Sequence, residues 1–227
     1  MSDRPRPDVV LVRHGATEWT MTRRHTGTTD IPLTEEGRRQ ARRLGEVLAR
    51  SGERFGRVLS SPLSRALDTC RLALAGAGGA VGSGFDIEVR DELREWDYGD
   101  YEGRTSADIR ASAPGWLLWT DGVPGGETID AIAERVDRVI ADIRSGDGRA
   151  GGGAPGGAGG GPVAPAAGPV AVFAHGHLLR VFAARWLGQP PTLGAHLGLA
   201  PASLSRLGWE HGVPSIALWN ERAHLTG

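Results

Sequence analysis

Three short polar clusters stand directly after apolar, β-branched runs in this chain of 227 residues. They read Arg13-His14-Gly15, Ser60-Ser61-Pro62 and His175-Gly176-His177, and Arg65 follows the second cluster by about one helical turn. Each run has the length and composition of a buried strand. Because ligands bind beyond the carboxyl ends of parallel strands, which meet at one edge of a sheet, we expect the clusters to lie close together.

The basic residues of these clusters indicate that the ligand is an anion. Two arginines and two histidines would meet at this edge: Arg13, Arg65, His14 and His175. Such a concentration of positive charge costs free energy when it is buried without an anion. Guanidinium groups offer paired N–H donors that match the oxygens of a phosphoryl group. A lone histidine is more often structural, but this combination predicts a phosphate-binding site.

Hydrophobic periodicity supplies the elements that would position this site. The runs predicted as strands are Asp8–Val12, Val58–Ser60, Ile87–Val89, Pro169–Ala174, Ser203–Trp209 and Ser215–Trp219. The stretches with helical spacing are Thr34–Arg50, Leu63–Ala75, Thr128–Ile143 and Leu178–Leu187, with Thr34 as an N-cap and Pro62 suited to a first turn. This order predicts an α/β fold with a mostly parallel central sheet flanked by helices. Without an internal repeat or a second core, we interpret residues 1–227 as a single domain.

Glycine accounts for 35 residues, concentrated in residues 145–169, with a second glycine-rich loop at 76–84. The longer stretch is almost wholly Gly, Ala and Pro, which bury too little apolar area to offset the entropy lost on ordering. We therefore interpret 145–169 as a flexible surface loop. A phosphate-binding glycine loop does not fit, because it requires a fixed spacing that ends in lysine, and the sequence contains no lysine.

The composition excludes several function classes. With 27 acidic and 26 basic residues, the formal net charge is −1, which argues against a nucleic-acid or membrane-surface partner. A hydrophobic fraction of 40% is enough for a core. The single cysteine, Cys70, excludes an internal disulfide and fits a reducing compartment. No apolar run is long enough to span a bilayer, and no secretory signal is present, so we expect a cytoplasmic protein.

The motif LVRHGATEW, Leu11–Trp19, resembles the signature of the histidine phosphatase superfamily, also called phosphoglycerate-mutase-like. Five further blocks resemble that family in the expected order: His25–Ala41, Ser60–Cys70, Glu92–Gly103, Gly125–Thr128 and Phe173–Arg180. The resemblance covers roughly residues 8–220 apart from the glycine-rich loop. Within the family, these blocks most resemble broad-specificity acid phosphatases and sedoheptulose-bisphosphatase-like enzymes.

The resemblance implies a role for each basic residue. His14 corresponds to the nucleophile that takes up the phosphoryl group as phosphohistidine. Arg13 and Arg65 correspond to arginines that hold the phosphoryl oxygens, and His175 to a second histidine that hydrogen-bonds an equatorial oxygen. Because these groups supply the positive charge, the family implies neither a metal nor a cofactor.

The proton donor is implied by the acidic block. The family pattern fits Leu93, Glu95 and Tyr98-Gly99, so Glu95 is interpreted as the acid that protonates the leaving oxygen and later the base that activates water. Glu92 and Asp97 are the alternatives, and each is otherwise explained as a surface acid in an ion pair.

Four residues are predicted to contact the rest of the substrate: Thr20, Thr26, Gly27 and Tyr98. The mutases of the family usually carry Asn where this chain has Thr20, a departure that weakens the expectation of phosphoglycerate selectivity. His177 fits two interpretations equally, as a residue that supports the site or as the polar start of a helix. The other four histidines, His25, His196, His211 and His224, are interpreted as surface or loop residues. Trp116 and Trp119 are candidates for shaping a lid over the substrate.

The sequence thus predicts hydrolysis of a phosphomonoester, with a small phosphorylated metabolite such as a sugar phosphate as the partner molecule. A cofactor-dependent phosphoglycerate mutase is the alternative, since it uses the same nucleophile. Mutases of the family usually carry a longer insertion after the acidic block and a longer tail than the residues after Trp219. A non-catalytic relative is disfavoured, because no catalytic position is lost. A homodimer is compatible with these features.

Overall fold

The structure is a computed structural model that describes residues 6–77, 86–146 and 168–225. Its centre is a six-stranded sheet with the strand order β3-β2-β4-β1-β5-β6. The strands are β1 (Val9–Arg13), β2 (Arg57–Ser60), β3 (Ile87–Val89), β4 (Val170–Ala174), β5 (Leu204–Glu210) and β6 (Val213–Glu221). Four of them, β3, β2, β4 and β1, pair in parallel, whereas β5 and β6 are antiparallel to their neighbours. The prediction of a mostly parallel sheet is confirmed.

The strand register brings the polar clusters to one edge of this sheet. Arg13 at the end of β1 pairs with Ala174 at the end of β4. Ser60 at the end of β2 pairs with Phe173, one residue earlier. The residues that follow these three strands therefore emerge side by side, as expected from the sequence.

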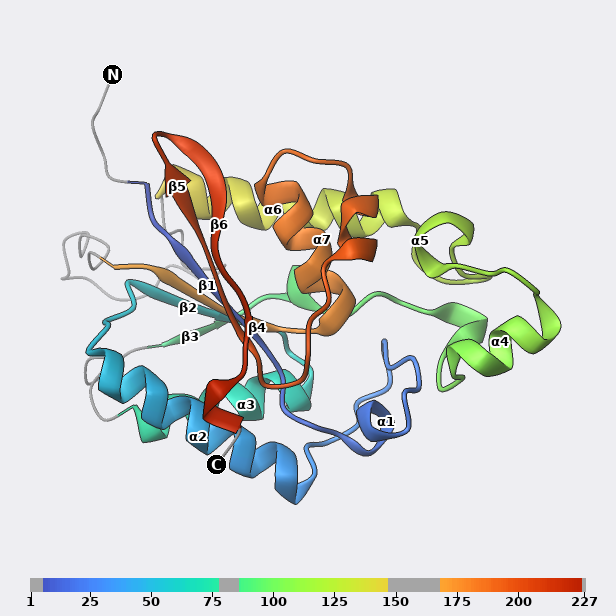
Figure 1. Cartoon of the computed structure of the whole chain (residues 1–227), viewed down its shortest axis with the longest axis horizontal. Helices are drawn as coiled ribbons and strands as arrows, with labels where there is room; N and C mark the ends of the chain where they lie inside the picture. Colours follow the sequence, from blue (N-terminus) through green and yellow to red (C-terminus); the bar gives the residue numbers. More distant parts are fainter. Residues whose placement is uncertain (1–5, 78–85, 147–167, 226–227) are drawn as a thin grey trace, which may run out of the picture.

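Helices cover both faces of the sheet (Figure 1). The α-helices are α1 (Glu18–Met21), α2 (Glu35–Ser51), α3 (Ser64–Gly76), α4 (Ser106–Ser112), α5 (Leu118–Asp121), α6 (Ile129–Ser145) and α7 (Gly176–Trp186). The 3₁₀ helices are η1 (Asp91–Leu93), η2 (Gly99–Tyr101), η3 (Pro191–His196) and η4 (Ala223–Leu225). In β1, Val10 and Val12 belong to the core beneath α2 and α3, while Val9 and Leu11 belong to the core beneath α6 and α7. Continuous apolar strands are the expected result of such two-sided burial.

The prediction of Thr34 as an N-cap is confirmed. Thr34 and Thr128 accept backbone N–H groups as the N-caps of α2 and α6, and Gly52 and Gly146 end these helices in the left-handed conformation. Two predictions were wrong. Helix α7 begins at Gly176 rather than at residue 178. Pro62 lies before Leu63, the N-cap of α3, and hence outside its first turn.

The two glycine-rich stretches lie largely outside the described residues. Of 145–169, the structure describes Ser145, the last residue of α6, Gly146, and residues 168–169. Residues 78–84 of the shorter stretch are likewise not described. The longer stretch joins α6 to the amino end of β4, whereas the polar clusters follow the carboxyl ends of the strands.

No helix in the described part of the chain is long and apolar enough to cross a membrane.

Candidate active site

His14 follows β1 directly, and one hydrogen bond fixes the tautomer of its imidazole. Its Nδ1 lies 2.8 Å from the carbonyl oxygen of Gly15. Because a carbonyl oxygen can only accept, Nδ1 carries the proton. The neutral ring therefore keeps its lone pair on Nε2, the atom that would attack phosphorus. The backbone N–H of His14 also donates to the carbonyl of Ala174 at 3.0 Å, which ties the residue to the end of β4.

The surroundings of His14 keep its ring uncharged. Burial lowers the pKa of His14 well below its ordinary value, and the positive charges of Arg13 and Arg65 lower it further. The side chain is almost fully buried. At neutral pH the ring is thus a free base, which is the form that a nucleophile requires.

Arg13 holds an unused hydrogen-bond donor next to His14 in the chain. One terminal nitrogen, Nη1, donates to the carbonyl of Leu199. Its Nε is buried and has no hydrogen-bond partner among the described residues. A buried N–H without an acceptor is costly, so this donor fits an anion that binds at the site. The guanidinium packs on Gly176, where an added Cβ would lie 3.1 Å from Cζ of Arg13.

Arg65 lies in the first turn of α3 and is completely buried. It donates to three carbonyl oxygens of one loop: those of Thr29 at 2.9 Å, Gly27 at 2.9 Å and Thr26 at 3.1 Å. The carboxylate of Glu102 accepts the N–H groups of Gly27 and Thr29 from the other side. Arg65 therefore positions this loop in addition to placing positive charge beside His14.

His175 follows β4 and connects the three strand ends. Its Nδ1 accepts a hydrogen bond from Nε of Arg65 at 3.2 Å. This leaves the proton on Nε2, which donates to the hydroxyl of Ser61 at 2.7 Å. The rings of His14 and His175 lie 5.2 Å apart, centroid to centroid. Burial, followed by the charge of Arg65, lowers the pKa of His175 well below its ordinary value, so His175 is a neutral N–H donor.

Glu95 is the acid that reaches the site. Its two carboxyl oxygens accept the backbone N–H groups of Trp96 at 3.0 Å, His177 at 3.0 Å and Leu178 at 2.8 Å. The last two belong to the first turn of α7, so the helix that follows His175 also orients the acid. Arg135 of α6 donates to the backbone carbonyl of Glu95 at 3.2 Å and thereby fixes its loop.

The two alternative acids have other partners. Glu92 accepts hydrogen bonds from Arg90, and this interaction lowers the pKa of the Glu92 carboxyl. Asp97 accepts the backbone N–H of Gly99 at 2.9 Å and stabilises the turn there. Neither acid lines the cavity described next, whereas Glu95 does. The structure therefore favours Glu95 over both alternatives.

A cavity of about 330 Å³ opens at this edge of the sheet, and we call it the catalytic cavity. Its wall is formed by Arg13, His14, Thr20, Arg23, Arg24, His25, Thr26, Glu95, Tyr98, Ser106, Gly176, His177, Arg180, Leu199 and Pro201. Thr20, Thr26 and Tyr98, which were predicted to contact the substrate, are among these wall residues. Gly27 does not line the cavity, because its N–H is bonded to Glu102 and its carbonyl to Arg65. Arg65 and His175 are fully buried and are not part of the open wall.

His25 corrects the interpretation of the minor histidines. It was expected as a surface or loop residue, and it does lie in a loop. It is nevertheless buried in the wall of the catalytic cavity, with Nε2 3.2 Å from the hydroxyl of Ser106. Burial, followed by the charge of Arg110, lowers the pKa of His25 to about 4. A backbone bridge between Arg24 and Thr105 brings the two segments together. Short-range sequence patterns give no signal for such a long-range pairing.

His177 belongs to the site rather than merely beginning a helix. Its Nδ1 lies 2.6 Å from the hydroxyl of Tyr98, and its ring packs at 5.5 Å from that of Trp119. Burial, followed by the charge of Arg180, lowers the pKa of His177 well below its ordinary value. Arg180 was not singled out from the sequence, although its spacing of four residues from Gly176 places both on one face of α7.

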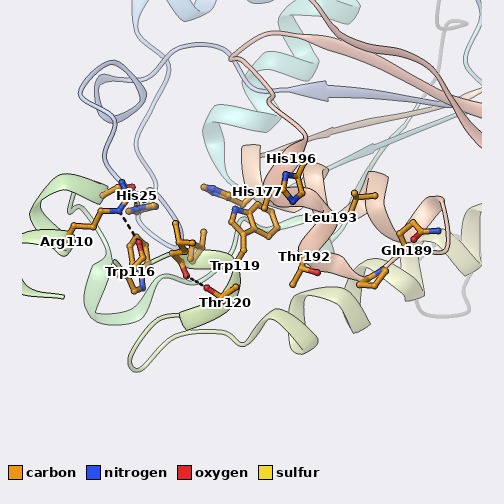
Figure 2. A pocket seen from close by; sticks show the side chains of 15 residues that line it. His25, Arg110, Trp116, Trp119, Thr120, His177, Gln189, Thr192, Leu193 and His196 are labelled. Atoms are coloured by element: carbon orange, nitrogen blue, oxygen red, sulfur yellow. Dashed lines mark hydrogen bonds between the residues drawn. The ribbon is translucent and has the colours of Figure 1, made fainter. Parts of the chain in front are cut away.

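A second cavity adjoins the catalytic cavity, and we call it the tryptophan cavity (Figure 2). Its volume is about 690 Å³, and it shares His25, Ser106 and His177 with the catalytic cavity. Trp116 and Trp119 form its wall, so they line a pocket beside the site. Of the remaining histidines, His196 is exposed on this wall, His211 is exposed elsewhere, and His224 is half-buried against the carbonyl of Ala202.

Among the described residues, no three or more His, Cys, Asp or Glu side chains form a group that could hold a metal ion.

Comparison with known proteins decides the family. A sequence profile of the histidine phosphatase superfamily (branch 1) matches residues 9–151 and 162–222. The chain belongs to the histidine phosphatase superfamily. The resemblance inferred from the sequence motifs is thereby confirmed.

Relatives within the histidine phosphatase superfamily include several phosphatases. An acid phosphatase of Mycobacterium tuberculosis is 35% identical over 221 residues, 95% of this chain and 93% of that protein. A sedoheptulose 1,7-bisphosphatase of Saccharomyces cerevisiae is 36% identical over 202 residues, 80% of this chain and 68% of that protein. The solved structure of a mycobacterial glucosyl-3-phosphoglycerate phosphatase with VO3 has a TM-score of 0.75, 30% identity, and coverage of 95% of this chain and 100% of that chain.

Proposed function

We propose that this protein hydrolyses phosphomonoesters through a phosphohistidine intermediate on His14. One observation carries the proposal. His14 is a neutral base with its lone pair on Nε2, next to a buried donor of Arg13 that has no partner in the described residues. A nucleophile beside an unsatisfied cationic donor is the arrangement that phosphoryl transfer requires.

In the first step, Nε2 of His14 attacks phosphorus, and the bond between phosphorus and the ester oxygen breaks. Arg13 and Arg65 stabilise the phosphoryl oxygens with positive charge, and the N–H of His175 provides a further donor once it turns from Ser61. Glu95 gives its proton to the departing oxygen, so the product leaves as an alcohol rather than an alkoxide.

In the second step, water attacks the phosphorylated His14. The Glu95 carboxylate, freed of its proton, takes one from the water as the new P–O bond forms. The bond between phosphorus and Nε2 breaks, and inorganic phosphate leaves. The imidazole then returns to its neutral form, and Glu95 carries a proton again for the next cycle. Arginine and imidazole groups provide the charge stabilisation in both steps, so the proposed reaction uses no metal and no cofactor.

The proposed substrates are small phosphorylated metabolites, sugar phosphates among them. Arg23, Arg24 and Arg180 add positive charge to the wall around the phosphate position, and they offer donors for hydroxyl or further anionic groups. Two of the relatives described above are named for sugar phosphate substrates. Their similarity over most of this chain supports the same substrate class here.

The intermediate can be trapped directly. The protein is mixed with a ³²P-labelled phosphomonoester and quenched in alkali within milliseconds, and the label on the protein is measured. We expect label that is stable in alkali, is lost in acid, and is missing from the His14→Ala variant. Label that persists in His14→Ala, or stability in acid, would contradict the assignment.

The mutase alternative has a distinct outcome. With 3-phosphoglycerate and a bisphosphoglycerate activator, a mutase forms 2-phosphoglycerate and releases little phosphate. We expect steady phosphate release from p-nitrophenyl phosphate and little 2-phosphoglycerate.

A further inference from the structure

The tryptophan cavity is built by segments that the catalytic steps do not use. Trp116 and Leu117 precede α5, and Trp119 lies within it. Leu193 belongs to η3, which also lines this cavity. Because His25, Ser106 and His177 line both cavities, the tryptophan cavity begins where the catalytic cavity ends. A leaving group that extends from a phosphate at His14 past these three residues would enter the tryptophan cavity.

The charge of the two cavities differs sharply. Four arginines line the catalytic cavity: Arg13, Arg23, Arg24 and Arg180. In the described wall of the tryptophan cavity the one arginine is Arg110, at one end, where its Nε donates to the carbonyl of Trp116 at 3.0 Å (Figure 2). His25 and His177 are uncharged at neutral pH, since burial lowers the pKa of each. An apolar group in this cavity leaves few polar groups without partners.

The aromatic walls are fixed before any ligand binds. Nε1 of Trp116 donates to the carbonyl of Gly122 at 2.9 Å. The indole of Trp119 packs on Gly194, where an added Cβ would lie 2.6 Å from the ring. Cζ of Arg180 lies 4.7 Å from the centroid of this ring, and the centroid of the Trp96 ring lies 5.7 Å from it. Rings held in this way lose little entropy on binding, so they form a ready surface for a flat partner.

We propose that the tryptophan cavity is the leaving-group subsite of this phosphatase and that it takes a flat, apolar group, so that aryl phosphomonoesters are preferred substrates. This inference rests on the proposed function and specifies its substrate class. The bond that breaks is again the one between phosphorus and the ester oxygen. Sugar phosphates place hydroxyl groups near the arginines of the catalytic cavity but leave the tryptophan cavity unfilled. They are therefore turned over with a lower kcat/KM.

The test compares 2-naphthyl phosphate with phenyl phosphate, whose leaving groups differ mainly in flat apolar area. We expect kcat/KM for the naphthyl ester to exceed that for the phenyl ester by about tenfold, the order that burial of one more aromatic ring gives. Most of the difference should appear in KM. Inhibition by inorganic phosphate reports on the catalytic cavity alone.

Two variants of the cavity sharpen the test. Leu117 is 50% exposed, so Leu117→Asp adds a charge to the cavity without disturbing the core. We expect this variant to reduce the naphthyl preference to about twofold or less and to leave inhibition by phosphate unchanged. Trp119→Ala should reduce the naphthyl preference to the same extent. Leu218→Asp is the matched control, because Leu218 is 38% exposed on β6 and lines neither cavity.

The outcomes separate the two proposals. Equal kcat/KM for both esters, or a naphthyl preference that survives in Leu117→Asp and Trp119→Ala, overturns the subsite while the phosphatase function stands. Failure of the parent protein to hydrolyse either ester overturns the proposed function and the subsite with it. A preference that is lost in both cavity variants and kept in Leu218→Asp supports the subsite.

Discussion

The catalytic cavity and the tryptophan cavity share three wall residues, yet they are built by different parts of the chain. Four of the residues that would react or bind phosphate lie at or just after strand ends or in the first turn of a helix: Arg13, His14, Arg65 and His175. The fifth, Glu95, lies in the loop after η1. The walls of the tryptophan cavity come from the short helices α5 and η3, outside the sheet. In Figure 1 the segment with α4 and α5 extends from the sheet, whereas α7 lies against it.

This difference suggests a division of labour. Catalytic groups need positions accurate to a fraction of an ångström, and parallel strands with two-sided burial provide them. Recognition of a leaving group tolerates variation in the positions of the residues that contact it. Those residues lie on connecting segments, whose sequence can change without disturbing the core. The same catalytic apparatus can thus serve different substrates. The predictions that follow test whether the two cavities are separable in this way, beginning with the largest expected effect.

Removal of the nucleophile should abolish turnover of every substrate, whatever occupies the tryptophan cavity. We expect His14→Ala to lower kcat/KM by at least about 10⁴ for sugar and aryl phosphates alike, because no other group is placed to form the covalent intermediate. His224→Ala is the control, since His224 lines neither cavity. Residual activity of His14→Ala within tenfold of the parent protein would refute the assignment of the nucleophile.

Loss of the acid should depend on the basicity of the leaving oxygen rather than on apolar size. We expect Glu95→Gln to lower kcat/KM for a sugar phosphate by roughly 10² to 10⁴, the usual yield of general acid catalysis. The loss for p-nitrophenyl phosphate should be clearly smaller, because p-nitrophenolate hardly needs a proton. kcat/KM is the quantity to compare, since it reports the steps up to phosphoryl transfer.

Equal losses on the two esters would instead make Glu95 a positioning residue. If Glu92→Gln or Asp97→Asn then showed the dependence on the leaving group, the acid role would pass to that residue.

The buried neutral imidazoles in and behind the cavity walls should make the stability of the fold sensitive to mild acid. The folded-state pKa values of His14, His175 and His177 lie well below 6.5, the ordinary value for histidine. Below about pH 6.5 the unfolded chain therefore binds protons that the folded protein does not bind, and the free energy of unfolding falls as the pH falls. Each such histidine should contribute about 1 kcal/mol of this decrease between pH 7.5 and 5.5.

Urea denaturation at the two pH values measures this decrease. We expect it to be smaller by about 1 kcal/mol in His177→Gln, which removes the imidazole shared by the two cavities. His211→Gln serves as the surface control. The same pH dependence in the parent protein and in His177→Gln would show that His177 is not held neutral.

The smallest expected effect is that of metal removal. In the proposed mechanism, arginine and imidazole groups stabilise the transferred phosphoryl group. Treatment with EDTA should therefore leave kcat/KM within about twofold of the value for the untreated protein, for sugar phosphates and aryl phosphates alike. A loss of activity on EDTA treatment that is reversed by added Mg²⁺ or Zn²⁺ would contradict the metal-independent mechanism.

Much of the catalytic cavity could be predicted because its residues are local to strand ends. The β-branched run before His14 predicted a buried strand. The expectation of parallel strands then predicted that His14 and His175 lie at the same edge of the sheet, as the pairing of β1 with β4 shows. Glu95 was more difficult, since three acids lie within six residues of one another. The structure favours it through contacts with the first turn of α7, which no local pattern reveals.

The tryptophan cavity was not predictable to the same extent. Trp116 and Trp119 were noted as candidates for a lid, but their enclosure by η3 depends on contacts across more than 70 residues. His25 shows the same limit. A lone histidine in a polar segment has the pattern of a surface residue, and only the pairing of Arg24 with Thr105 buries it.

The connection between α6 and β4 has a consequence for how this protein can change over time. It enters the sheet at the amino end of β4, across the sheet from His175 at the other end of the same strand. Gly168, where the described chain resumes before β4, lies beside Arg54 and Gly56 just ahead of β2, at the edge of the sheet opposite His14 and His175. A change in chain length introduced at this edge leaves the strand ends that carry the reacting groups in place. For protein engineering, the same position is the natural place to splice in a reporter domain or an affinity tag.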